Sequence, residues 1–139
     1  MKGKVLLIDF KYNNWKGITN ELSRWLNHHN FETELFYWEE NLALFESNFH
    51  ETKNKQFELN VEKAIEVAKG ADVVFVHFGI IPRVKASEVL GRFKAVGIKV
   101  IVNSASSISF EAADYVYDNS DDILKLLENI QKLCQKNRS

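Results

Sequence analysis

The chain has 139 residues, of which 45% are hydrophobic, and this is enough for one ordinary domain that needs no disulfide or metal to hold its core. Its 18 basic and 19 acidic residues give a formal net charge of −1 without blocks of like charge, which argues against nucleic acid and membrane surfaces as partners. The single cysteine, Cys134, cannot form an internal disulfide, and we expect a small apolar filler in a protein of the reducing cytoplasm.

The first part of the chain predicts a strand, a helix and a second strand. Within residues 4–10 an apolar run from Val5 to Ile8 ends at the acidic Asp9, which is typical of a parallel strand buried on both faces. The run is too short for a signal peptide or a membrane span. Apolar residues recur at helical spacing over residues 14–29, with Asn13 or the asparagine after it as the cap. Residues 31–38 alternate in character and predict a strand nearer the sheet edge.

The middle of the chain gives the weakest pattern. Residues 39–56 form a polar, charged insert between the second strand and the second helix, and long inserts in compact domains are often functional. Asn60 is suited to cap the second helix, and Gly70 stands where a left-handed residue would end it. The apolar face of this helix comprises Val61, Ala64, Ile65 and Ala68.

The second half of the chain repeats the alternation of strands and helices. Residues 72–78 have the buried-strand pattern, and Pro82 marks the loop that follows. Residues 84–96 predict a third helix that closes at Gly97, and residues 99–103 predict a further apolar strand.

The C-terminal part predicts one short strand and one long helix. The strand covers residues 115–117. Ser120 then provides a cap, and residues 121–122 provide two acidic side chains at the positive end of the last helix. The apolar face of that helix comprises Ile123, Leu126, Leu127, Ile130 and Leu133.

This order of elements predicts an α/β fold. Strands that alternate with helices through short connections form a parallel sheet with right-handed crossovers and helices on both faces. We therefore expect one domain over residues 1–139, a three-layer sandwich with five parallel strands in the order 2-1-3-4-5 and flavodoxin-like topology.

Polar residues are expected at the carboxyl ends of these strands, where ligands bind in sheets of this kind. The ligand-binding candidates at this edge are Asp9, Lys11, His77, Ser104, Ser106 and Asp118, with Asn103 beside them. Asp9, His77 and Asp118 could converge on one metal ion or one proton, because carboxylates and neutral imidazole are both ligands and bases. For each residue alone the preferred interpretation is structural: a loop cap for Asp9 and a ring bonded to a backbone carbonyl for His77. We therefore predict no catalytic set and no metal site.

The sequence lacks the motifs that bind common cofactors. It has no G-x-G-x-x-G after the first strand, no Walker A lysine loop and no Ser/Thr-rich turn for a flavin phosphate, so we predict no cofactor. Large aromatic side chains on the first helix and in the insert are better suited to the core or to a protein partner than to base stacking. The partner-contact candidates are Trp15, Trp25, Phe45 and Phe49.

Several segments resemble response-regulator receiver domains, in the order in which that family has them. KVLLID at 4–9 resembles the first strand, SEVLGRFK at 87–94 the third helix, GIKVIV at 97–102 the fourth strand, and ADYV at 113–116 the fifth strand. Ser104 matches the family's switch hydroxyl. The resemblance implies the same five-stranded fold, but residues 106–113 are too few for a normal helix between the last two strands. We expect that helix to be shortened or absent.

The resemblance fails at the residues that carry receiver chemistry. The family needs an acidic pair after the first strand, an aspartate after the third and a lysine after the fifth. Here Asp9 keeps one acid, while Phe10 replaces its neighbour. His77 or Phe78 replaces the phosphate acceptor, and Asp118 replaces the lysine. Aspartyl phosphorylation is therefore not expected, and the lost oxygen ligands remove the reason for magnesium to bind.

Two functions follow from these patterns. The resemblance implies a degenerate, non-phosphorylatable receiver-like signalling or regulatory module, which acts without catalysis through a protein partner or self-association. The alternative is a domain that binds a small molecule or a phosphate, either as a binding protein or as an enzyme. It would use the strand ends, with the 39–56 insert as a lid. Converging polar side chains at the strand ends would favour the alternative, whereas Phe10 and Phe78 filling that end would favour the module.

Overall fold

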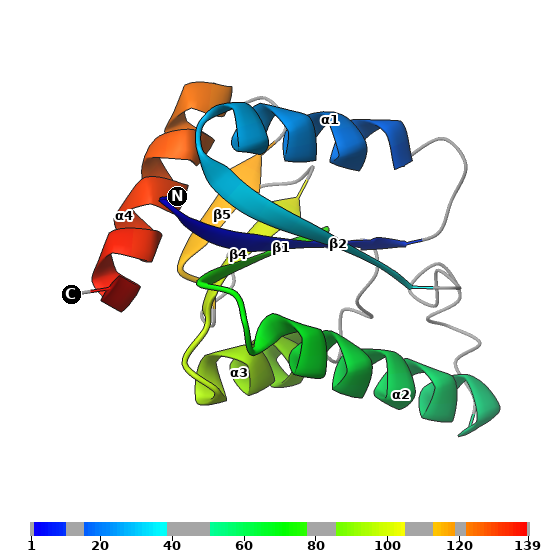
Figure 1. Ribbon diagram of the computed structural model, residues 1–139. Coiled ribbons are helices and arrows are strands. Elements are labelled where there is room, and N and C mark those ends of the chain that lie inside the picture. Colours follow the sequence, from blue (N-terminus) through cyan, green and yellow to red (C-terminus); the bar gives the residue numbers. More distant parts are fainter. Residues whose placement is uncertain are drawn as a thin grey trace.

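Five strands and four helices alternate along the parts of the chain that the computed structural model describes, which are residues 2–10, 16–38, 51–77, 86–104, 113–118 and 122–138 (Figure 1). In chain order they are β1 (Gly3–Phe10), α1 (Lys16–His28), β2 (Phe31–Trp38), α2 (Glu51–Ala68), β3 (Val73–His77), α3 (Ala86–Ala95), β4 (Lys99–Ser104), β5 (Tyr115–Asp118) and α4 (Ile123–Arg138). None of the described helices is long and apolar enough to cross a membrane.

The strands form one sheet in the order β2-β1-β3-β4-β5, and each neighbouring pair runs parallel. Helices α1 and α4 cover one face of the sheet, and α2 and α3 cover the other (Figure 1). This arrangement confirms the predicted three-layer α/β fold with strand order 2-1-3-4-5. The predicted shortening of the helix between the last two strands concerns residues 105–112, which lie outside the described residues.

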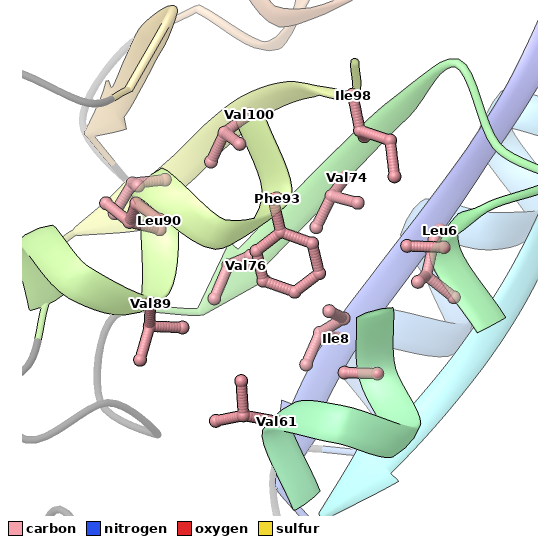
Figure 2. Close-up of a cluster of buried hydrophobic side chains, with 13 residues drawn as sticks. Leu6, Ile8, Val61, Val74, Val76, Val89, Leu90, Phe93, Ile98 and Val100 are labelled. Carbon is pink, nitrogen blue, oxygen red and sulfur yellow. The ribbon is translucent and has the colours of Figure 1, made fainter. Parts of the chain in front are cut away.

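The sheet is buried on both faces, which is why its central strands read as continuous apolar runs. Figure 2 shows the face under α2 and α3, where Phe93 of α3 points toward Val74 and Val76 of β3. The buried residues of this face are Leu6, Ile8, Val61, Ala64, Ala68, Val74, Val76, Val89, Leu90, Phe93, Ile98, Val100 and Val102. Those of the face under α1 and α4 are Val5, Leu7, Leu26, Phe31, Val73, Phe75, Ile101, Leu126, Ile130, Leu133 and Cys134.

Helix α4 packs closely on the start of β1. A Cβ atom added to Gly3 would lie 2.6 Å from the Cys134 Sγ atom, so the glycine is what allows this approach. The free thiol of Cys134 is 1% exposed and sits among apolar side chains, in agreement with its predicted role as a small apolar filler.

Helix α1 is joined to the edge strand β2 by side-chain hydrogen bonds as well as by apolar packing. The Ser23 and Thr33 hydroxyl oxygens lie 2.6 Å apart, and Thr33 donates to Asn27 Oδ1 at 3.1 Å. The Tyr37 hydroxyl donates to Asn20 Oδ1 at 3.2 Å. The helix residues are three and four positions apart, so one stripe of α1 meets alternate residues of the strand.

Helix α2 begins well before the predicted position. Asn60 is an interior residue of α2 rather than its cap, and residues 51–56 of the predicted insert are helical. In the sequence, Phe57 stands four residues before Val61, so helical apolar spacing already begins before Asn60. The rest of the insert, residues 39–50, lies outside the described residues.

The described helices end in two different ways. Gly97 has a φ of 83°, which confirms the predicted left-handed end of α3. Gly70 was expected in the same conformation, but this prediction is wrong, because the Ala71 N–H donates to the Ala68 carbonyl in an ordinary turn. Asn30 takes the left-handed conformation after α1, with a φ of 69°.

The start of α4 also differs from the prediction. The helix begins at Ile123, and the Asp122 Oδ1 atom accepts a hydrogen bond from the Leu124 N–H at 2.9 Å. Asp122 is therefore the cap, in place of Ser120. Ile123 was expected on the buried face, but this prediction is wrong: Ile123 is 42% exposed, and the buried face of α4 begins at Leu126, which is 1% exposed.

Candidate functional site

A row of polar side chains crosses the sheet near the carboxyl ends of all five strands. We call it the polar row, and from β2 to β5 it consists of Tyr37, Asp9, His77, Asn103 and Tyr117. The strand register pairs Asp9 with Tyr37, His77 with Asn103, and Asn103 with Tyr117. The residues just before Asp9 and His77 are also register partners, so these two occupy neighbouring positions on β1 and β3.

The polar row lies on the face covered by α1 and α4. The residues two positions earlier on each strand belong to the apolar cluster of that face, and strand side chains alternate between faces. The Tyr37 hydroxyl bonds to Asn20 of α1, and the Tyr117 ring lies 6.4 Å from the Phe75 ring of the same cluster.

The opposite face shows no matching change in polarity among the described side chains. Ile8, Val76 and Val102 immediately precede Asp9, His77 and Asn103, and all three remain buried beneath α2 and α3. The next residues on that face, Phe10, Phe78 and Ser104, have side chains that lie outside the described part of the chain.

Burial and charge give the centre of the polar row its electrostatic character. Asp9 is 3% exposed and Asn103 is 8% exposed. Burial lowers the pKa of His77 from its ordinary 6.5, while the nearby Asp9 carboxylate and a backbone hydrogen bond oppose that shift. The imidazole is therefore mainly neutral at pH 7, with one nitrogen as donor and the other as acceptor.

Tyr37 is the member of the polar row on β2, and its phenol is protonated at neutral pH. Burial raises the pKa of its phenol above the ordinary 10.0, and the negative charge of Asp9 raises it further. The hydroxyl keeps its proton at neutral pH and donates a hydrogen bond to Asn20 Oδ1.

The polar row combines a carboxylate with a neutral imidazole, an amide and two phenols on a rigid sheet. A carboxylate beside an imidazole can hold and transfer a proton, and the amide and phenol groups can orient a bound molecule. Asp9 and Asn103 are the buried members of the row, and polar groups at that depth are costly unless they are hydrogen-bonded.

The polar row contains two of the predicted ligand-binding residues, Asp9 and His77. Ser104 and Asp118 are register partners of each other, one residue beyond the row on their strands, and their side chains lie outside the described part of the chain. Lys11 and Ser106 lie outside the described residues altogether. Within the described residues, no group of three His, Cys, Asp or Glu side chains is placed to hold a metal ion.

Among the partner-contact candidates, Trp25 alone falls within the described residues, since Trp15, Phe45 and Phe49 lie outside them. Trp25 is half-buried and packs against the apolar cluster under α1. Its ring also meets His29 edge-on, with the centroids 4.8 Å apart.

The sequence patterns missed Tyr37 and Tyr117 as members of a site. Each tyrosine stands two residues after an apolar residue that faces α1 and α4, as Asp9 does after Leu7. Choosing, on every strand, the polar residue two positions after an apolar residue of that face would have selected the polar row. Ser104 and Asp118 would have been left out.

Comparison with known proteins supports the fold alone. No family model matches the chain, and no curated protein matches it. Among solved structures, a 3-dehydroquinate dehydratase-like protein from Bifidobacterium longum is similar, with a TM-score of 0.57 and 11% sequence identity, over 95% of this chain and 98% of that chain. Likeness at this identity extends to the α/β architecture and not to activity.

Proposed function

We propose that the chain is a small-molecule-binding domain whose site lies at the carboxyl ends of β1, β3 and β4, on the face covered by α1 and α4. The observation that carries this proposal is the polar row, because its five side chains share one register and one face. Ligands in open parallel sheets bind at this edge. The predicted alternative, a small-molecule domain, therefore has more support than a module that acts only by contact.

The central pair, Asp9 and His77, gives this site acid–base capacity. A neutral imidazole can accept a proton from a bound molecule, and the adjacent carboxylate stabilises the resulting imidazolium. Asn103 lies directly beside His77 and can orient the ligand through its amide. These groups support binding and proton transfer, and binding is tested first.

The test is a thermal-shift panel on the purified chain. It contains divalent metals, acetyl phosphate, nucleotides, flavin, sugar phosphates and unphosphorylated sugars, because a molecule that binds only the native state raises Tm. The proposal expects at least one compound to raise Tm in the wild type and to lose that effect in Asp9→Asn. The control is Asp72→Asn at the opposite edge of the sheet, which keeps the response. A panel that is flat, or equally effective on Asp9→Asn, would contradict the proposed site.

The second candidate is the module that the receiver resemblance implies, a regulatory domain acting by protein contact. It is favoured by two adjacent apolar side chains at the start of α4, Ile123 at 42% and Leu124 at 61% exposure. Self-association is the direct test, by analytical ultracentrifugation over a range of concentrations. Leu124→Ser should weaken it, whereas Leu59→Ser, at an exposed apolar position on α2, should not. A monomer at all concentrations would remove self-association from this candidate.

A further inference from the structure

Two hydrogen bonds of the same kind join α1 to β2, and they end in different surroundings. The hydroxyl oxygens of Ser23 and Thr33 lie 2.6 Å apart, and the Tyr37 hydroxyl donates to Asn20 Oδ1 at 3.2 Å. In the register of β1 and β2, Thr33 stands beside a core valine, whereas Tyr37 stands beside Asp9. One bond therefore ends next to the apolar core, and the other ends in the polar row.

The hydrogen bond to Asn20 fixes how the Tyr37 phenol can interact with a bound molecule. A hydroxyl has one proton with which to donate a hydrogen bond, and here it donates to α1. The phenol oxygen keeps its acceptor capacity, so a ligand meets it as an acceptor. Tyr37 is half-buried, where a donor without a partner is costly. If the acceptor on α1 were removed, the phenol would therefore turn to another acceptor.

The Asp9 carboxylate is the acceptor to which the phenol would then turn. It is the register partner of Tyr37, and its charge, after burial, is the second cause that raises the pKa of that phenol. The same charge partly offsets the effect of burial, which lowers the pKa of His77. A hydrogen bond from the phenol would stabilise the carboxylate and weaken its electrostatic effect on the imidazole.

We propose that Asn20 is a positioning residue for the polar row: by accepting the hydrogen bond of Tyr37, it directs the phenol donor toward α1 and away from Asp9. This inference rests on the proposed function, because it names a residue that prepares the same site. It makes α1 a part of the site, whereas the ligand-binding candidates from sequence all stand at strand ends or in the loops after them.

The experiment follows the pKa of His77 through its ring resonances by NMR, which needs no ligand. Asn20→Leu removes the acceptor at similar size, and the pKa of His77 should fall because the phenol turns to Asp9. Asn20→Asp keeps an acceptor oxygen at the same position and should show no fall. Ser23→Ala, which removes the matched hydrogen bond beside the core valine, should leave the His77 pKa unchanged.

A double variant tests whether Asn20 acts through Tyr37. Tyr37→Phe has no phenol hydroxyl at this position, so the addition of Asn20→Leu should not change the His77 pKa further. If Asn20→Leu does not fold, Asn20→Ala replaces it in the same comparisons, because it removes the acceptor without adding bulk.

The positioning role and the proposed site fail on different results. An unchanged His77 pKa in Asn20→Leu, or an equal fall in Ser23→Ala, would overturn the positioning role and leave the proposed site standing. A fall that persists in the Tyr37→Phe background would also overturn it, because Asn20 would then not act through the phenol. A flat thermal-shift panel would overturn the proposed site, and with it any role of Asn20 in binding, even if the His77 pKa falls as expected.

Discussion

The two edges of the sheet use aspartate in opposite ways. At the amino edge, Asp72 and Asp114 each stand just before a strand, in the related stretches Ala-Asp-Val-Val and Ala-Asp-Tyr-Val. The Asp72 Oδ2 atom accepts from the Lys4 N–H at 2.8 Å, and the Asp114 Oδ2 atom accepts from the Val100 N–H at 2.7 Å. Each aspartate also donates its own N–H to the carbonyl of the same partner.

At the carboxyl edge, Asp9 interacts with side chains that can titrate. Its charge raises the pKa of Tyr37 and partly offsets the lowered pKa of His77. The amino-edge carboxylates complete a backbone ladder, whereas Asp9 sits in a row of side chains that the ladder does not require. We infer that substitutions at the amino edge mainly reduce stability and that substitutions at the carboxyl edge mainly change binding and titration.

The largest expected loss of stability comes from closing the space at Gly3. In Gly3→Ala the new methyl group would lie 2.6 Å from Cys134 Sγ and 3.1 Å from Asp72 Oδ2, so α4 or the strand must move. Overpacking of this kind costs about 1–3 kcal/mol of unfolding free energy, measurable by urea denaturation. Gly91→Ala on α3 is the control, with nothing within 4 Å of the added Cβ, and should stabilise the helix by about 0.5–1 kcal/mol. Equal stability of the two variants would contradict the close packing at this edge.

The next effect tests the hydrogen bonds of the amino edge. Asp114→Ala leaves the buried Val100 N–H without its carboxylate acceptor, and we expect a loss of about 1–3 kcal/mol of unfolding free energy. Asp114→Asn keeps an acceptor oxygen and should cost less. Glu88→Ala, at an exposed position on α3, should change stability by less than about 0.5 kcal/mol. A cost for Asp114→Ala no greater than that of Glu88→Ala would rule out a ladder role for this carboxylate.

At the carboxyl edge, Asp9→Asn keeps nearly the same shape and removes a buried negative charge. Its main effect is on titration. The negative charge of Asp9 raises the pKa values of both His77 and Tyr37, so both should fall in the variant. Measurement of the His77 ring resonances against pH by NMR checks this. Asp72→Asn should leave the His77 value unchanged, and an unchanged value in Asp9→Asn would place Asp9 away from the imidazole.

Much of the fold could be predicted from sequence because burial leaves a strong local pattern. The bounds of β2 were predicted correctly from alternation, and strand order followed from the regular succession of strands and helices. Errors arose where two local signals competed. Asn60 has the side chain of a cap, but the apolar spacing from Phe57 onward continues the helix through it. Gly70 suits a left-handed end, although the turn there does not need one.

The candidate site was only partly predictable, for a different reason. Asp9 and His77 were selected because they stand at strand ends, which local pattern does reveal. Membership of one row also depends on register between strands distant in the sequence, such as β1 and β3, and a single strand does not encode that register. Tyr37 and Tyr117 were therefore interpreted as ordinary strand residues, although they complete the row.

The smallest expected effect is on the pH dependence of the unfolding free energy, through His77. Burial lowers the folded-state pKa of His77 below 6.5, the ordinary value that applies to the unfolded chain. In the pH window between the folded-state pKa and 6.5, the unfolded chain therefore binds more protons than the native chain. The stabilising contribution of the neutral imidazole is present above 6.5 and is lost as pH falls through that window. His77→Asn should therefore show a smaller loss of unfolding free energy than the wild type between about pH 7.5 and about pH 5.5. Asp9→Asn should show a larger loss, because removal of the carboxylate lowers the folded-state pKa further and widens the window. Identical pH profiles for the wild type and His77→Asn would mean that this imidazole is not held neutral by burial. The two edges would then not differ in titration as we infer.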